Sequence, residues 1–342
     1  MSGRESGPIL EVRDLAVSFR TERGLVRAVD GVSFTLGARE ILSIVGESGS
    51  GKTLTVLSVM GLVRDPNAIV EGSIRFRGRE LVGLPDREMR RVRGGAIAMI
   101  FQNPMTALTP VYSIGHQIAE QVRAHRSLSR RAAWARAVEL IEAVGIPNPE
   151  GAAHRFPHEL SGGMRQRGVI AMALSCDPAL LLADEPTTAL DVTVQAQILD
   201  LIRRLRADFG SSVILITHNM GVVAEIADRV AVMYAGRIVE RAETRALFCE
   251  PRHPYTLGLL GSIPPLEGER PRRLPAIPGT PPSPFAIPEG CPFAPRCRWR
   301  MAACAVRPPL IADAAHETAC ILSEEARAAA RAELLGVEVG AA

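Results

Sequence analysis

The distribution of apolar and polar residues predicts a chain in which strands and helices alternate. Within the first forty residues, polar positions alternate with β-favouring apolar positions, a pattern typical of short antiparallel strands. Continuous apolar runs predict buried strands at 41–45, 179–186 and 212–218, and a helical period covers 192–208. Because these strands alternate with helices, we expect an α/β fold with a parallel sheet whose functional loops follow the C-terminal ends of its strands.

The same patterns assign most of the remaining chain. They predict a helix from about Leu54, strand-like segments over residues 69–102, mainly helices over 104–178 and a last helix near 323–336. Residues 264–288 contain nine prolines, which predict a stiff, irregular linker or wrapping arm rather than a regular element.

Composition limits the classes of protein that the chain can belong to. Its 342 residues, 47% of them hydrophobic, are enough for two or three structural units with buried cores. No apolar run reaches the roughly 18 to 20 residues that span a bilayer, and residues 1–40 lack a secretory signal pattern. We therefore expect a cytosolic chain unless a partner holds it at a membrane. The net charge of +3, with acidic and basic residues interspersed, gives no indication of nucleic acid as a partner.

The segment GESGSGKT predicts a phosphate-binding loop. It fits the pattern G-x-x-x-x-G-K-[ST], follows the apolar strand 41–45 and opens a helix, which is the context this motif requires. Its glycines allow successive backbone N–H groups to face a phosphate, and the helix N-terminus adds partial positive charge. The predicted loop consists of Gly46, Glu47, Ser48, Gly49, Ser50, Gly51, Lys52 and Thr53.

Lys52 is the only lysine in the chain, and the other residues counted with it among the lysines and arginines are all arginine. Its ammonium can bridge the β and γ phosphates of a nucleotide, while the Thr53 hydroxyl can bind Mg²⁺. An ammonium is compact, whereas a planar guanidinium needs room and a two-pronged partner, so a closed loop around phosphate should exclude arginine. We therefore predict that Lys52 takes part in the chemistry.

Two acidic residues follow the second predicted buried strand. Asp184 and Glu185 emerge together at its C-terminal end, in the segment LLLADEP. Asp184 suits a contact to Mg²⁺, usually through water, and Glu185 suits a general base that polarises the attacking water. An ordinary turn at the end of a strand would also explain the tripeptide DEP taken alone, but its combination with the phosphate loop favours the catalytic interpretation.

A second glycine-containing helix start lies in LSGGMRQR, residues 160–167, where Ser161, Gly162 and Gly163 again suit an anion. At this point the chain resembles the ATP-binding cassette (ABC) ATPases, and the resemblance covers roughly residues 9–250 with the expected motifs in order. It implies a P-loop NTPase fold with a parallel RecA-like core, an antiparallel β subdomain and an α-helical subdomain. It also implies that this signature loop of one cassette caps ATP held by the phosphate loop of another.

The resemblance assigns roles to further residues. It implies that Gln102, in FQNP, senses the γ-phosphate region, contributes to Mg²⁺ binding and reports to the membrane partner. Asp191 would bridge the cassette dimer and His218 would contact the γ-phosphate. Phe19 is the aromatic residue placed to stack on adenine, although an aromatic residue in a strand is often part of the core.

Two other segments resemble the peptide and nickel importer branch of this family. They are residues 101–117 and the ending that contains PRHPYTLGLLGSIP, IPGTPPSP and GCPFAPRC. The resemblance implies a nucleotide-binding domain at residues 1–250, with its helical subdomain at 104–178, followed by an irregular extension at 251–342. We therefore expect the first cassette type of a dipeptide or oligopeptide importer.

In that branch, two different cassette subunits pair beneath two permease subunits, and an extracytoplasmic binding protein delivers the cargo. The resemblance thus implies a place at the cytoplasmic face of the membrane and a groove within residues 104–165 for a permease helix. The cargo stays open among dipeptides, oligopeptides and nickel, since the cassette does not touch it. Two alternatives are a soluble cassette protein that acts on DNA or ribosomes and a metal-responsive regulator with a secondary ATPase.

The extension contains four clustered cysteines. Cys291, Cys297, Cys304 and Cys320 are separated by five, six and fifteen residues. In a reducing cytosol such a cluster suggests metal before disulfide, but paired zinc ligands usually lie two to four residues apart. We expect a 4Fe-4S cluster that stabilises the extension, with zinc or reduced, metal-free thiols as the alternatives.

Overall fold

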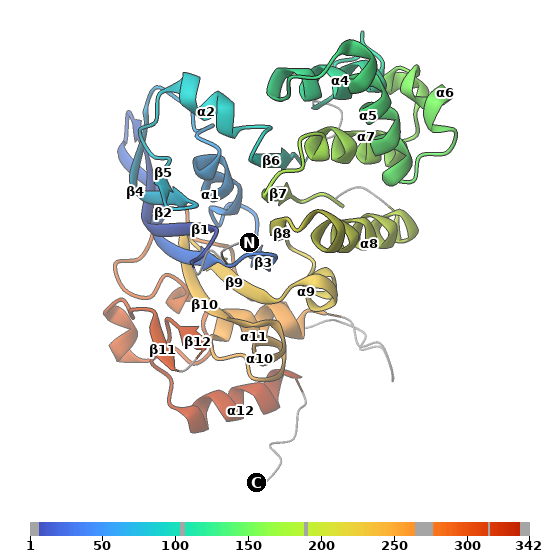
Figure 1. Cartoon of the computed structure of the whole chain (residues 1–342). Coiled ribbons are helices and arrows are strands. Elements are labelled where there is room, and N and C mark those ends of the chain that lie inside the picture. The colour runs from blue at the N-terminus through green and yellow to red at the C-terminus, as the bar shows by residue number, and fades with distance from the viewer. Residues whose placement is uncertain (1–6, 103–106, 188–190, 264–275, 314, 336–342) are drawn as a thin grey trace.

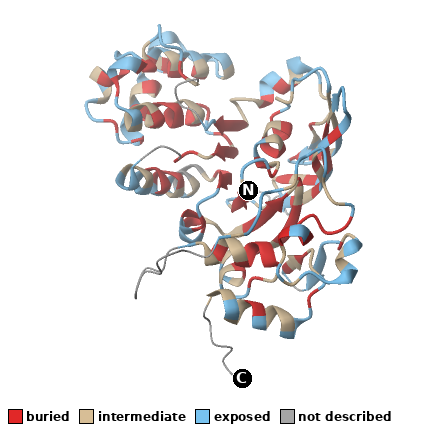
Figure 2. Ribbon diagram, turned by 180° about the vertical axis from the view of Figure 1, so that it is seen from behind, coloured by how far each residue is buried: buried red, intermediate tan, exposed pale blue. Residues whose placement is uncertain are grey.

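The computed structural model describes residues 7–102, 107–187, 191–263, 276–313 and 315–335 (Figure 1). An antiparallel sheet near the N-terminus, a mainly parallel central sheet, a group of helices and a C-terminal extension follow one another in the chain. Figure 2 shows that buried positions gather in the strands, whereas the helices and the extension expose much of their outer surface. None of the helices within these ranges is both long and apolar enough to cross a bilayer.

The N-terminal sheet has the strand order β2-β1-β4-β5. β1 pairs antiparallel with β2 on one side and with β4 on the other, which confirms the antiparallel strands expected in the first forty residues. The strands are β1 (Leu10–Thr21), β2 (Gly24–Leu36), β4 (Ala68–Phe76) and β5 (Arg79–Glu80).

The central sheet has the order β11-β12-β10-β9-β3-β8-β7-β6. From β9 to β6, neighbouring strands of this order pair in parallel, which confirms the expected parallel core. The parallel strands are β3 (Ile41–Val45), β6 (Ile97–Ile100), β7 (Leu180–Asp184), β8 (Ser212–Thr217) and β9 (Arg229–Tyr234).

Alternate residues of the parallel strands β6, β7 and β8 belong to two cores, on opposite faces of the sheet. In β8, Val213 and Leu215 pack into the core shared with the helical part, whereas Ile214 and Ile216 pack into the core shared with α1 and the N-terminal sheet. Both faces of these strands are therefore apolar, which explains why they read as continuous apolar runs in the sequence. Because the sheet is covered on both sides, the C-terminal ends of its parallel strands are held in fixed positions.

The helices agree with most of the predicted segments, and those between residues 114 and 174 stand apart from the N-terminal sheet in Figure 1. Residues 103–106, at the start of the predicted helical segment, lie outside the described residues. The helices are α1 (Lys52–Val59), α2 (Asp86–Val92), α4 (Ile114–His125), α5 (Arg130–Ala143), α6 (Pro149–Ala153), α7 (Gly162–Leu174), α8 (Val192–Phe209), α9 (Met220–Ile226), α10 (Thr244–Cys249), α11 (Pro254–Gly261) and α12 (Glu324–Leu335).

Two segments differ from the prediction. Helix α2 interrupts the segment 69–102 that we expected to be strand-like. Acidic residues in its first turn and arginines in its last turn complement the helix dipole, and Met89 and Val92 bury one side. Residues 220–261, to which the sequence patterns assigned no element, form β9 and β10 (Arg237–Glu243) together with the helices α9, α10 and α11.

The C-terminal extension is less irregular than we expected. Two short strands, β11 (Ile311–Asp313) and β12 (His316–Thr318), extend the central sheet, because β12 pairs antiparallel with β10. This pairing covers the backbone groups that β10 would otherwise leave open at the sheet edge. The proposed boundary between residues 250 and 251 stays a prediction, since β12 and β10 lie on opposite sides of it in sequence and share one sheet.

Candidate active site

The phosphate loop connects β3 to α1 through glycines in conformations that other residues avoid. Gly46 has φ 153° and Gly51, the N-cap of α1, has φ 100°. A Cβ atom at Gly46 would lie 2.2 Å from the carbonyl oxygen of Met233 in β9, so this close approach requires glycine. The loop therefore rests on the end of β9.

Lys52 is the first residue of α1 and is buried inside the loop. Its Nζ donates hydrogen bonds to the carbonyl oxygens of Gly46 and Glu47, both at 2.8 Å. Burial lowers the pKa of Lys52 below its ordinary value, and the nearby carboxylates of Glu185, Asp184 and Glu47 oppose that change. The ammonium is thus held at the centre of the loop by short contacts that fit a small cation.

Thr53 and Asp184 meet although 131 residues separate them in the sequence. The Thr53 hydroxyl donates a hydrogen bond to Asp184 Oδ1 at 3.2 Å. Burial raises the pKa of the Asp184 carboxyl, and the hydrogen bond from Thr53 partly offsets this rise. A hydroxyl and a buried carboxylate side by side are oxygen ligands that Mg²⁺ prefers. The residues present therefore fit the predicted Mg²⁺ site.

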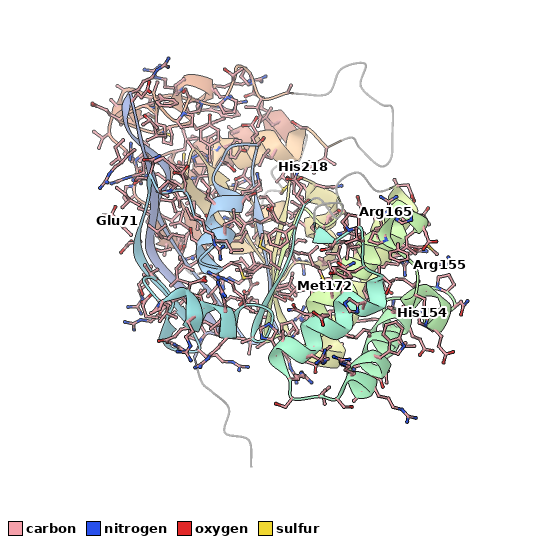
Figure 3. The ribbon with its side chains drawn as sticks, turned by 90° about the horizontal axis from the view of Figure 1, so that it is seen from above. Glu71, His154, Arg155, Arg165, Met172 and His218 are labelled. Carbon is pink, nitrogen blue, oxygen red and sulfur yellow. The ribbon has the colours of Figure 1, made fainter. Side chains whose placement is uncertain are left out.

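Glu185 lies between the two polar residues predicted to act with it. Gln102 Nε2 donates to Glu185 Oε2 at 3.0 Å, and His218 Nδ1 lies 3.3 Å from Glu185 Oε1. Gln102 follows β6, Glu185 follows β7 and His218 follows β8, so the parallel register brings all three to one edge of the sheet. Figure 3 shows His218 between the sheet that carries Glu71 and the segment after α6 that carries His154 and Arg155.

The signature residues lie at exposed helix starts. Ser161 is the N-cap of α7 and accepts a hydrogen bond from Met164 N, while Asp191 is the N-cap of α8 and accepts one from Val194 N. A Cβ atom at Gly163 would lie 3.1 Å from Val194, so the starts of α7 and α8 are close to each other. Thr188, Ala189 and Leu190, which precede Asp191, lie outside the described residues.

Phe19 is half-buried in β1, opposite Val26 of β2 and Ala68 of β4, and packs against the core beneath the N-terminal sheet. Its predicted stacking on adenine stays a prediction.

Sequence reasoning missed two residues of the extension that reach the phosphate loop. The Tyr255 hydroxyl accepts a hydrogen bond from Glu47 N at 2.7 Å. Arg296 forms two hydrogen bonds with the Glu47 carboxylate, at 2.6 and 3.0 Å. Both residues lie more than 200 positions from Glu47, and their types give no local signal of such a contact.

The four cysteines of the extension line one cavity, together with His253, Trp299 and other residues. Burial raises the pKa of the Cys297 thiol to about 11, and burial also raises the pKa values of Cys291 and Cys320. Within the described part of the chain, no group of three or more His, Cys, Asp or Glu residues is arranged to hold a metal ion. This finding does not support the zinc alternative or an iron-sulfur cluster, and the cluster stays a prediction.

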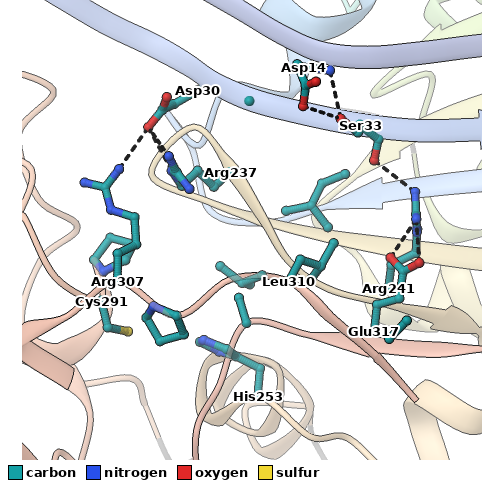
Figure 4. Close-up of a pocket in the computed structure, with 17 residues that line it drawn as sticks. Asp14, Asp30, Ser33, Arg237, Arg241, His253, Cys291, Arg307, Leu310 and Glu317 are labelled. Atoms are coloured by element: carbon teal, nitrogen blue, oxygen red, sulfur yellow. Dashed lines mark hydrogen bonds and ion pairs between the residues drawn. The ribbon is translucent and has the colours of Figure 1, made fainter. Parts of the chain in front are cut away.

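A larger cavity of about 390 Å³ lies between the N-terminal sheet and the extension (Figure 4). Its charged residues pair with one another across it. Asp30 accepts hydrogen bonds from Arg237 at 2.8 Å and from Arg307 at 3.2 Å, and Arg241 bonds Glu317 at 2.8 Å. The pairs made by Arg307 and Glu317 attach the extension to the rest of the molecule.

Comparisons with known proteins agree with this geometry. Residues 29–188 match the family model described as ABC transporter, and residues 239–304 match the model described as oligopeptide/dipeptide transporter, C-terminal region. A structure of the ATP-binding cassette MJ0796, in a dimeric post-hydrolysis state with ADP and Pi, is similar with a TM-score of 0.63 and 25% identity. The similarity covers 69% of this chain and 99% of that one. The cassette fold expected from the sequence is thus confirmed.

Relatives of known description cover most of the chain. It is 55% identical to the oligopeptide transport ATP-binding protein OppD of Bacillus subtilis (strain 168), over 86% of this chain and 82% of the relative. It is 49% identical to OppD of Haemophilus influenzae, over 89% of this chain and 93% of that relative. It is also 51% identical to OppD of Mycobacterium tuberculosis over 98% of this chain, but spans only 55% of that relative's length. The chain therefore belongs to the ABC transporter family, in the branch that contains the oligopeptide transport ATP-binding proteins.

Proposed function

We propose that this chain is the ATP-hydrolysing subunit of a membrane importer for oligopeptides or dipeptides. The observation that carries the proposal is the cluster of Lys52, Thr53, Asp184, Glu185 and His218 at the C-terminal ends of three neighbouring parallel strands. The match of residues 239–304 to the oligopeptide/dipeptide transporter region supports a peptide cargo over nickel and over a soluble role.

The residues of the cluster divide the chemistry among them. Lys52 and the loop amides bind the phosphates, and Glu185 takes a proton from the water that attacks the γ-phosphorus as the bond to the leaving ADP oxygen breaks. His218 orients the γ-phosphate beside Glu185. Thr53 and Asp184, with Gln102, would hold Mg²⁺, which neutralises negative charge on the phosphates. Phosphoryl transfer needs such positioning and charge neutralisation more than covalent catalysis.

A second cassette completes the site in this proposal. Ser161, Gly162 and Asp191 are exposed in the described structure and lie at helix starts, which favour an anion. Supplied by one cassette, they would cap ATP that lies on the phosphate loop of the other. Binding of ATP would close the cassette dimer and hydrolysis would reopen it, which drives the permeases.

The partners follow from this role. We infer a heterodimer with a second ATPase subunit, two permease subunits and an extracytoplasmic binding protein, with this chain at the cytoplasmic face of the membrane. The relatives named above are described as oligopeptide transport ATP-binding proteins, which supports a role in a transport assembly.

Uptake in cells tests the proposal. Cells that lack this chain should regain uptake of a labelled oligopeptide or dipeptide when the wild-type gene is supplied, and should not regain it with Glu185→Gln. Labelled nickel, measured in parallel, separates the two cargo classes. Restored nickel uptake without peptide uptake would contradict the peptide proposal, and recovery of peptide uptake with Glu185→Gln would contradict the role of Glu185.

We also propose that the four cysteines bind a 4Fe-4S cluster. Their shared cavity supports this proposal, and in such a cluster each thiolate binds a different iron, so the sulfur atoms need not converge on one ion. Protein prepared without oxygen should show broad brown absorbance and about four irons per chain. Cys297→Ser should lose both, whereas Cys249→Ser, at an exposed position outside the cavity, should keep them. Colourless, iron-free wild-type protein would contradict the proposal.

A further inference from the structure

The extension holds the side chain of Glu47, which lies inside the phosphate loop. Arg296 Nη1 donates to Glu47 Oε2 at 2.6 Å, and Arg296 Nη2 lies 3.0 Å from Oε1. The two parallel hydrogen bonds form a bidentate pair, the geometry that a guanidinium makes best with a carboxylate. The Arg296 side chain is only 5% exposed, so water screens this pair weakly.

The guanidinium itself is fixed by its surroundings. Arg296 Nε donates to Pro278 O at 2.8 Å, and Nη1 lies 3.4 Å from the Tyr234 hydroxyl. The charge also lies 6.0 Å from the centre of the Phe293 ring. Because these contacts come from several segments, Arg296 has little freedom to leave Glu47.

The backbone of Glu47 is held by the same part of the chain. Its N–H donates to Tyr255, while its carbonyl oxygen accepts a hydrogen bond from Lys52 Nζ at 2.8 Å. Val45, at the end of β3, packs in one core with Tyr255 and Phe293. The extension therefore contacts the loop through the side chain and backbone of Glu47, and it shares a core with the strand that leads into the loop.

Glu47 places a negative charge on the loop that would receive the phosphates of a nucleotide. A free carboxylate there would repel each phosphate, and the repulsion would grow with the charge of the ligand. A guanidinium paired with it cancels this charge and keeps the carboxylate turned toward the extension.

We propose that Arg296 is a positioning residue for nucleotide binding, which neutralises Glu47 and keeps the phosphate loop open to a polyphosphate. The inference rests on the proposed binding of ATP at this loop. It assigns the extension a part in nucleotide affinity, beyond its attachment to the sheet.

Equilibrium binding to the full chain tests this role. Titration with Mg²⁺-ATP, ADP and AMP should show that Arg296→Met raises the Kd for ATP about tenfold, which corresponds to about 1.4 kcal/mol. The factor should be smaller for ADP and smallest for AMP, because repulsion falls with phosphate charge. Arg298→Met is the matched control, since Arg298 lies two residues away, is half-exposed and pairs only loosely with Glu333 at 3.4 Å.

A second substitution separates charge from structure. Adding Glu47→Gln to Arg296→Met should bring the Kd for ATP within about twofold of that of Glu47→Gln alone, since the repelling charge is gone. Arg296→Lys, which keeps the charge but loses the paired hydrogen bonds, should give an intermediate Kd. If circular dichroism shows that Arg296→Met does not fold, the double variant and Arg296→Lys are used for the test instead.

Two results would overturn the inference. One is ATP binding by Arg296→Met that equals that of Arg298→Met. The other is an equal loss for ATP, ADP and AMP that Glu47→Gln does not restore. A wild-type chain that binds no ATP would instead contradict the proposed function, so the two failures are distinguishable.

Discussion

At the scale of single residues, Lys52 explains why one lysine occurs in an arginine-rich chain. Its Nζ contacts the carbonyl oxygens of Gly46 and Glu47 within the closed loop, and we expect a planar guanidinium not to fit there. We predict that Lys52→Arg lowers ATP hydrolysis by about 100-fold or more, although the charge is kept. Phosphate release measures this effect, and Arg131→Lys, at an exposed position on α5, is the control for a change between the same two residues. Turnover of Lys52→Arg at the wild-type rate would show that charge alone matters.

Glu185 contacts both Gln102 and His218, as a base that orients water at the γ-phosphate should. We predict that Glu185→Gln binds ATP but hydrolyses it about 10² to 10⁴ times more slowly, because the amide cannot accept the proton. With ATP and Mg²⁺ present, the variant should remain in the closed cassette dimer. Light scattering in the presence of the partner cassette reports this state, and a variant that stays monomeric with ATP would contradict the composite site.

His253 links the stability of the extension to pH. It is fully buried, and burial lowers its pKa to about 4, while the Glu240 carboxylate works in the opposite direction. Between pH 6.5 and 4 the unfolded chain binds a proton that the folded chain does not, so stability falls as pH falls. When the pH falls from 7 to 5, protonation of this histidine in the unfolded chain should lower the free energy of unfolding by about 2 kcal/mol.

The variant His253→Asn tests this contribution. Asparagine can keep the helix cap that His253 Nδ1 provides to Tyr255 N, but it does not titrate in this range. Urea unfolding at pH 7 and pH 5 should therefore show a smaller pH dependence for the variant. An unchanged difference between the two pH values would assign the acid sensitivity to other groups.

Sequence motifs single out the residues that we propose to act on the phosphates, because phosphate and Mg²⁺ chemistry demands particular residue types at fixed spacings. The contacts between Thr53 and Asp184 and between Glu185 and His218 join residues that the sequence had already singled out. Arg296 and Tyr255 were missed, since an arginine or a tyrosine that reaches a loop more than 200 residues away follows no local rule.

At the scale of elements, the turn from β3 into α1 depends on two glycines with different constraints. At Gly46 a Cβ atom would lie 2.2 Å from Met233 O, whereas at Gly49 nothing lies within 4 Å, although both have positive φ. We predict that Gly46→Ala lowers the free energy of unfolding by about 3 kcal/mol or more, through strain and displacement of β9. Gly49→Ala should cost only about 1 kcal/mol, from its φ value alone. Equal urea midpoints for the two variants would contradict the steric argument.

Elements with a strong apolar pattern were predicted well, and the misses have physical causes. The parallel strands β3, β7 and β8 are buried on both faces, so their sequences are mostly apolar. Helix α2 is short and has few apolar residues, so it gave little periodicity. The polar residues of β10 pair with other segments, as Glu240 does with His316, and hide the strand pattern.

At the scale of the whole molecule, the extension is integrated with the cassette rather than appended to it. β12 continues the central sheet, Arg307 bonds Asp30 of β2 and Arg296 bonds Glu47 of the phosphate loop. The prolines of residues 264–288 predict a linker or a wrapping arm, and residues 264–275 of this segment lie outside the described residues, so that choice stays a prediction; composition in any case cannot specify which surface such a segment covers. The pairing partners could be known only once the fold brought distant residues together.

The measurement that tests the central claim most directly is ATP hydrolysis by the assembled transporter in liposomes, with its partner cassette, permeases and binding protein. Hydrolysis should rise when the binding protein carries an oligopeptide or dipeptide, should not rise with nickel, and should vanish with Glu185→Gln in this chain. If the isolated chain hydrolyses ATP equally fast alone, and no cargo stimulates the complex, this chain is not the motor of an importer.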